Sequence, residues 1–168
     1  KIGLPGTRTG IVIASEEIIN IITRMNAVLN LSIGSVGPTL AYDLVTSGEI
    51  TRLSKTIIKP YYQNKSKLAL ELFHHELVGL DYYIHKSEGA MFLWLWFPDL
   101  PITSEILYQR LKGRGVLIIS GHHFFPGLGG DWRHKNECIR VTYSMDENII
   151  EQGVKIIAEE VKKAYGQT

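Results

Sequence analysis

Residues 80–97 read LDYYIHKSEGAMFLWLWF, and this stretch decides the kind of fold that the sequence encodes. Leu80–Ile84 and Met91–Phe97 are rich in aromatic and branched residues, and a Lys-Ser-Glu-Gly turn separates them. Such runs predict two strands of one sheet. Alternation puts three aromatic side chains of the second strand on one face, where core packing or an interface explains them: Phe92, Trp94 and Trp96.

The residues after this stretch predict a small sheet covered by helices. Thr103 or Ser104 caps a helix that runs through Lys112, because either hydroxyl can accept a bond from the first helical turn. Periodicity predicts three further elements. They are strands at Val116–Ile119 and Ile139–Tyr143 and an amphipathic helix at Asp146–Tyr165.

The residues before it predict the end of a larger α/β layer and a long helix. A strand at Ile11–Ala14 leads through a Ser15 cap into a helix at about Glu16–Leu29, and a second helix begins near Pro38 and ends by Gly48. A long helix that Pro60 must bend or divide follows from Glu49 to Leu77. The fold class is therefore α/β to α+β, with one domain at 1–48 and the long helix and a small domain at 49–168.

Composition excludes several classes of protein. The 168 residues are 45% hydrophobic and 21% charged, with a net charge of +1, so we expect a globular chain with neither nucleic acid nor a membrane as partner. No apolar run reaches the length of a membrane span. Cys138 is the single cysteine and cannot form an internal disulfide, which indicates a reducing compartment such as the cytoplasm.

The first ten residues, KIGLPGTRTG, carry the chemistry. They place a lysine, a Gly/Pro turn and an arginine ahead of the predicted strand. A lysine that forms a Schiff base must be unprotonated when it attacks, and an apolar or cationic setting favours that form. The guanidinium of Arg8 could grip a phosphate through two parallel hydrogen bonds.

This opening resembles the lysine signature of class I pyridoxal-phosphate-dependent aminotransferases of fold type I, in which an arginine and a glycine follow a Schiff-base lysine. Lys1, Gly6, Arg8 and Gly10 stand in those places. The gap from Lys1 to Arg8 is one residue shorter than the commonest spacing, and the valine–pyruvate branch of the family shares the shorter gap.

Further segments continue the resemblance in the family's order. They are 31–38, 58–62, the 87–96 strand with serine in place of the usual proline, the 114–127 strand and Pro-Gly loop, and ECIRVTYS at 137–144. The last of these resembles the strand whose arginine binds the substrate's α-carboxylate, and Arg140 stands in that place. Several weak matches in the correct order carry more weight than any one of them.

The resemblance implies an activity and its residues. The intact enzyme would hold pyridoxal 5'-phosphate on Lys1, which also moves the proton; Arg8 would bind the phosphate and Arg140 the carboxylate. It would exchange an amino group between an amino acid, valine or alanine, and a keto acid, pyruvate, as a homodimer. Because the sequence opens without a methionine, we expect it to be the C-terminal part of that enzyme and inactive alone.

Three other interpretations stay open or are set aside. An aminotransferase of different specificity, or an effector-binding domain of a regulator without turnover, fits the same motifs. Six histidines suggest a metal site, but neighbouring histidines on a strand or helix diverge, so we expect no metal ligands. His122 and His123 are retained only as residues that line the substrate's entrance.

Overall fold

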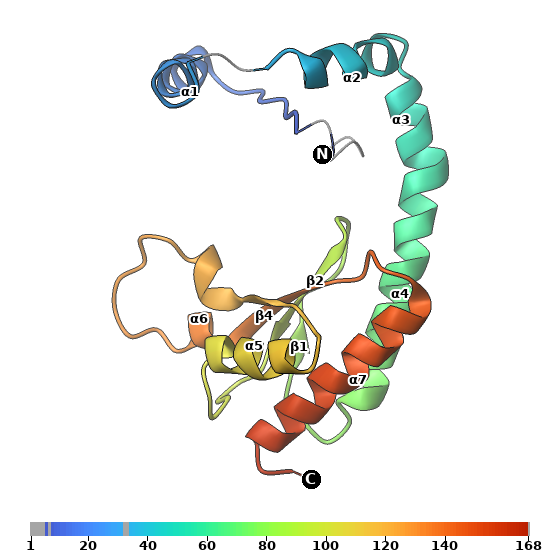
Figure 1. Cartoon of the computed structure of the whole chain (residues 1–168), viewed down its shortest axis with the longest axis vertical. Helices are drawn as coiled ribbons and strands as arrows, with labels where there is room; N and C mark the ends of the chain where they lie inside the picture. The colour runs from blue at the N-terminus through green and yellow to red at the C-terminus, as the bar shows by residue number, and fades with distance from the viewer. Residues whose placement is uncertain (1–5, 7, 32–33, 168) are drawn as a thin grey trace. The chain divides into compact units, whose positions relative to one another are not determined.

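The computed structural model of the chain describes residue 6 and residues 8–31 and 34–167 (Figure 1). Their contacts separate two compact units, residues 1–60 and residues 61–168. The domain division expected at residues 48 and 49 stays a prediction. In the described part of the chain, no helix combines the length and the apolar character needed to cross a membrane.

Helices make up the first unit, and the two that the sequence predicts are confirmed. The N-cap of α1 is Ser15, in extended conformation and without a side-chain capping bond. Glu16 and Glu17 occupy the first turn of α1, where the helix dipole favours acidic residues. The bounds are α1 Glu16–Leu29, α2 Val36–Thr46 and α3 Glu49–Leu53.

The strand predicted at Ile11–Ala14 is wrong for this structure, because these residues form no ladder and lie exposed. A β-strand exists only where a neighbouring strand accepts and donates its backbone hydrogen bonds. The described residues of this unit supply no such neighbour. β-branched residues alone therefore misled the prediction.

The helical path continues from α3 into α4 (Lys59–Glu76) through one π-helical turn, η2 (Ser54–Ile58). Lys59 donates its backbone N–H to the carbonyl of Ser54, five residues earlier. Pro60 follows immediately, and a proline has no N–H and crowds the carbonyl four residues before it. The wider turn removes that conflict, so the interruption predicted at Pro60 is confirmed in this form.

A four-stranded antiparallel sheet forms the centre of the second unit, in the order β1-β2-β4-β3. The two strands predicted at Leu80–Ile84 and Met91–Phe97 belong to this sheet, since Ile84 lies opposite Leu95. The first of them is shorter than predicted, because only Tyr83 and Ile84 belong to β1. The strand predicted at Val116–Ile119 is wrong in its extent, because only its last residue belongs to β3. The bounds are β1 Tyr83–Ile84, β2 Phe92–Trp96, β3 Ile119–Ser120 and β4 Cys138–Thr142.

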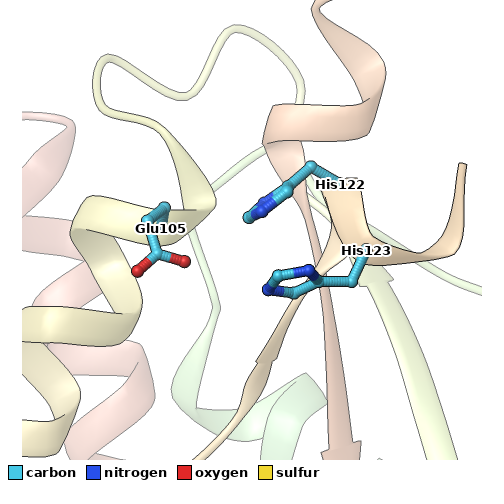
Figure 2. A group of neighbouring side chains, drawn as sticks. All are labelled: Glu105, His122 and His123. Atoms are coloured by element: carbon cyan, nitrogen blue, oxygen red, sulfur yellow. The ribbon is translucent and has the colours of Figure 1, made fainter. Parts of the chain in front are cut away.

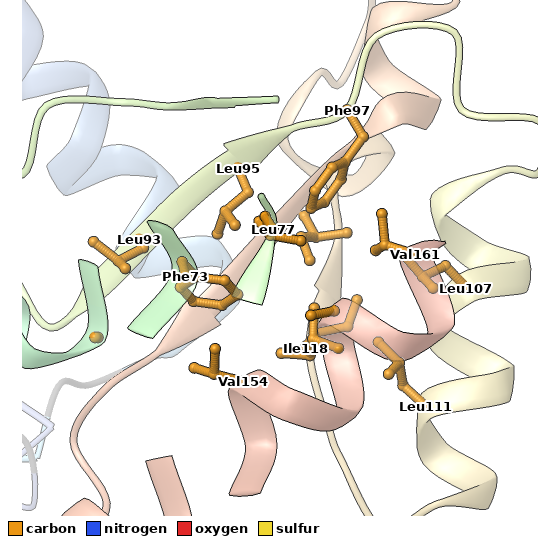
Figure 3. Packing of buried hydrophobic residues seen from close by; sticks show 14 of the residues in the cluster. Phe73, Leu77, Leu93, Leu95, Phe97, Leu107, Leu111, Ile118, Val154 and Val161 are labelled. Atoms are coloured by element: carbon orange, nitrogen blue, oxygen red, sulfur yellow. The ribbon is translucent and has the colours of Figure 1, made fainter. Parts of the chain in front are cut away.

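Three helices and one face of the sheet enclose the hydrophobic core (Figure 3). They are α4, α5 (Ser104–Gly113) and α7 (Glu147–Ala164), and Thr103 caps α5 by accepting a bond from Ile106 N–H as predicted. Leu93 and Leu95 of β2 are buried in this core. The aromatic residues of β2 alternate with them and lie half-buried outside this cluster. Of the two explanations predicted for those aromatics, packing into this core is therefore wrong, and an interface stays a prediction.

Two short helices were not predicted, and both lie between β3 and β4. A 3-10 turn, η3 (Gly121–Phe124), follows β3 directly, and α6 (His134–Glu137) directly precedes β4. Neither has the length that gives a periodic signal in sequence. They matter because η3 carries the pair His122 and His123.

Candidate functional site

The predicted site residues fall in both units, and the structure describes them unequally. Lys1 lies outside the described residues, as does most of the motif that follows it. Arg8 is exposed in a turn with φ of 52°, a left-handed conformation that non-glycine residues seldom adopt. Among the residues that the structure describes, no carboxylate pairs with its guanidinium.

Arg140 lies at the middle of β4, where the register places it opposite Trp94 of β2 and Ile119 of β3. Its guanidinium carbon is 4.2 Å from the ring centre of Phe92 and 4.7 Å from that of Phe124. Both contacts are within the range at which a cation is attracted to an aromatic face. Residues from β2 and η3 thus hold the half-buried guanidinium.

An arginine on a strand can instead serve a structural ion pair with an acid near the strand's end. Within the described part of the chain, no carboxylate lies within ion-pair distance of this guanidinium. A planar guanidinium makes two parallel hydrogen bonds to a carboxylate, and aromatic contacts leave its N–H groups available for that purpose. The arrangement can therefore bind a carboxylate that comes from outside the protein.

A layer of aromatic side chains extends from Arg140 across the same face of the sheet. Trp94 meets Phe124 edge to face at 5.1 Å between ring centres, and Trp96 stacks on Tyr83 at 5.0 Å. The indole N–H of Trp96 donates to a carboxylate oxygen of the buried Glu137 at 2.9 Å. The alternating sequence predicted a shared aromatic face, but the contacts with η3 could not be foreseen because η3 itself was not.

His122 and His123 do not diverge as the sequence analysis expected. Their ring centres lie 3.9 Å apart, because they follow one another on a 3-10 turn and not on a strand or an α-helix. Figure 2 shows both rings on the side that faces Glu105 of α5. Potential ligand atoms of these three residues all lie within 4.8 Å of one another. We call these three residues the Glu-His-His cluster.

A second group of possible metal ligands consists of His134 and Cys138, and it differs from the Glu-His-His cluster in its chemistry. Cys138 Sγ lies 3.5 Å from His134 Nε2. Burial is the main cause that raises the pKa of the Cys138 thiol to about 12. Metals bind the thiolate form, so this thiol is a poor ligand at neutral pH.

Comparison with known proteins identifies the family. The model of the family described as aminotransferase class I and II matches residues 1–157. The chain is 47% identical over all 168 residues to the valine–pyruvate aminotransferase of Escherichia coli, of whose length it spans 40%. The less similar relatives include an uncharacterized aminotransferase of Saccharolobus solfataricus, 29% identical over 164 residues, or 96% of this chain and 39% of that relative.

Solved structures agree with the sequence relatives. A crystal structure of valine-pyruvate aminotransferase from Salmonella typhimurium superposes with a TM-score of 0.85 at 46% identity, covering 99% of this chain and 43% of that one. One of a putative amino-acid aminotransferase from Psychrobacter arcticum gives 0.86 at 45% identity, covering 100% and 39%. The helices and small antiparallel sheet are thus part of the aminotransferase fold of type I, and the chain belongs to the class I and II aminotransferase family.

Proposed function

We propose that the whole protein is a pyridoxal-phosphate-dependent aminotransferase that moves an amino group between valine or alanine and pyruvate. Membership of the family and the identity of 47% to a valine–pyruvate aminotransferase support this proposal. The structural observation that carries it is the guanidinium of Arg140, which contacts two phenylalanine rings and has no acidic partner among the described residues.

Arg140 would bind the α-carboxylate, which amino acids and their keto acids share. Two parallel hydrogen bonds fix the direction of the carboxylate and hence of the Cα–H bond. The rings of Phe92 and Phe124 restrict the guanidinium, so less conformational entropy is lost on binding. One arginine can thus serve both halves of the transfer.

The opening residues would hold the cofactor. When bound, pyridoxal phosphate supplies an electron sink for the negative charge that develops at Cα. The exposed guanidinium of Arg8 has the donors that a phosphate needs, and no carboxylate among the described residues occupies it. Lys1 would act first as nucleophile and then, with its amine free, as the base that moves the Cα proton. The family motif supports its role.

Two further properties belong to the same proposal. Since the chain spans 40% of the length of the relative from E. coli, we propose that residues 1–168 alone have no appreciable turnover. We also propose that the whole protein acts as a homodimer in the cytoplasm. A single cysteine, Cys138, which is buried, fits a reducing compartment.

Borohydride reduction of the full-length protein with pyridoxal phosphate, followed by peptide mass mapping, tests the proposal. We expect one pyridoxyl group on the Lys1 side chain. The full-length protein is required because a terminal Lys1 would also offer an α-amine with a pKa of about 8, which can form the same adduct. Labelling of another lysine, or of none, would overturn the assignment.

Turnover is then measured with valine and with alanine against pyruvate or another keto acid. Transfer from either amino acid with ping-pong kinetics is the expected result. Lys1 labelling together with transfer from unrelated amino acids only would leave the reaction type intact and reject the substrates. Cofactor binding without any turnover would support the regulatory alternative.

A further inference from the structure

We propose that the Glu-His-His cluster is a binding site for a divalent transition metal ion of the zinc class. Glu105 comes from the first turn of α5, and the two histidines come from η3, seventeen and eighteen residues later. Figure 2 shows the carboxylate and both imidazole rings directed toward a common point. No step of the proposed transfer uses these three side chains.

The chemistry of the ligands selects the metal. Two imidazole nitrogens and one carboxylate oxygen form a set that zinc sites with an open fourth position use. Bond lengths near 2.1 Å around a tetrahedral ion separate ligand atoms by about 3.4 Å. In the structure the corresponding atoms lie within 4.8 Å of one another. A difference of this size is within reach of side-chain rotation, because His123 is exposed and the other two side chains are partly so.

A hydrogen-bonded chain orients His122. Its Nδ1 lies 2.7 Å from the hydroxyl of Ser120, which lies 2.6 Å from the hydroxyl of Ser104. Both serines are buried, so these bonds form in place of bonds to water. When Nδ1 donates to Ser120, the lone pair resides on Nε2, which is the form that binds metal. Metal-binding histidines usually have such an outer partner.

The surroundings of the cluster favour a cation. Glu105 forms no ion pair with any described residue; its carboxylate accepts one hydrogen bond, from the amide of Gln109 at 2.9 Å. Its negative charge is therefore not neutralised by a neighbouring lysine or arginine. The ligands open on a pocket of about 390 Å³, whose wall includes Tyr108, Ile118 and Ile119. That volume leaves room for a water molecule or a small anion as the fourth ligand.

The other adjacent histidines, His74 and His75, provide a control inside the same unit. His74 Nδ1 lies 2.7 Å from the hydroxyl of Tyr82, and His75 Nδ1 lies 3.3 Å from a carboxylate oxygen of Glu76. Each of these two imidazoles thus has its own hydrogen-bond partner, and the two do not share one. Loss of this pair removes as many imidazoles as loss of the cluster pair, and only the position differs.

Titration of the full-length protein with Co²⁺, followed by its visible absorption and by calorimetry, tests the site. The protein carries its cofactor, and no amino acid is present that could chelate the ion. We expect about one Co²⁺ per chain, displaced by Zn²⁺, and at least about tenfold weaker binding in E105Q, H122A and H123A. The double variant H74A/H75A is expected to bind as the unmodified protein does.

Thermal unfolding supplies a second measurement. A ligand that binds only the folded protein raises the unfolding midpoint, so Zn²⁺ should stabilise the unmodified protein and H74A/H75A but not H122A/H123A. If H122A unfolds because its bond to Ser120 is lost, the variants E105Q and H123A decide the question, since neither of those side chains makes that bond. Absence of stoichiometric binding, or binding that survives H122A/H123A, would overturn the proposal.

Discussion

Three arginines of the second unit differ in what surrounds their guanidinium groups. The guanidinium nitrogens of Arg114 lie 2.6 Å from a carboxylate oxygen of Glu159 and 3.1 Å from one of Glu160. These ion pairs join the C-terminal end of α5 to α7. Arg133 pairs with Asp99 and Glu137. The guanidinium of Arg140 contacts the rings of two phenylalanines, whereas those of the other two arginines contact carboxylates. A cation held in that way is attractive to an external anion, whereas a cation already paired is not.

Replacing Arg140 with lysine tests this reading at the scale of one residue. Lysine keeps the charge but cannot make two parallel bonds to a carboxylate or stack a planar group on an aromatic ring. We expect the KM for the amino acid to rise about 10- to 100-fold in the full-length enzyme, which corresponds to one lost charge-assisted hydrogen bond. Steady-state kinetics measures it, and the exposed Arg110→Lys serves as control. Equal KM values in both variants would contradict the assigned role.

Helices and strands differed in how well the sequence predicted them. The core-facing apolar residues of α5 and α7 recur with the helical period within each helix, so the sequence of each helix was enough to predict it. Strands depend on partners, and Ile11–Ala14 shows that a β-branched run without a described partner forms no strand. The turn η3 had no periodic signal at all. Its conformation depends on how closely Gly121 approaches the start of β4.

Gly121 provides the prediction at the scale of elements. A Cβ atom at this position would lie 2.6 Å from the carbonyl oxygen and 2.7 Å from the Cβ of Cys138, so backbone would have to move. We expect Gly121→Ala to reduce the free energy of unfolding by about 1–3 kcal/mol, a typical cost of overpacking. Urea denaturation followed by circular dichroism measures this loss.

Gly153 in α7 is the matched control. A Cβ there would meet no atom within 4 Å, and alanine is the better helix former. Gly153→Ala should therefore raise the free energy of unfolding by roughly 0.5–1 kcal/mol. Shifts of the same sign in the two variants would show that the close approach of η3 to β4 does not limit stability.

At the scale of the molecule, the predicted and the unpredicted parts of the site have different origins. The role proposed for Arg140 rests on its own strand, because the surrounding residues carry the family's pattern. The contact of Phe124 with its guanidinium and the approach of Glu105 to the histidines join elements that are distant in sequence. Only the packing of α5 and η3 against the sheet creates those contacts, and no local pattern encodes such packing.

Burial is distributed unequally between the two units. In the described part of residues 1–60, α1 buries no side chain. The buried residues of α2 and α3 are Gly37, Ala41 and Ile50. The core cluster of the second unit instead runs from Ala69 to Val161 and joins three helices to the sheet. Hydrophobic burial is the main favourable term in folding, so the second unit has the stronger basis for independent stability.

A chain of residues 59–168, which keeps α4 whole, should therefore fold by itself. Calorimetry should show one cooperative transition with an enthalpy of about 70 kcal/mol, as expected for a domain of about 100 residues. Residues 1–58 alone should show no such transition. Burial of only Gly37, Ala41 and Ile50 among the described helical residues cannot offset the conformational entropy that folding removes. A broad, non-cooperative transition of 59–168 would mean that the core from Ala69 to Val161 depends on residues outside it.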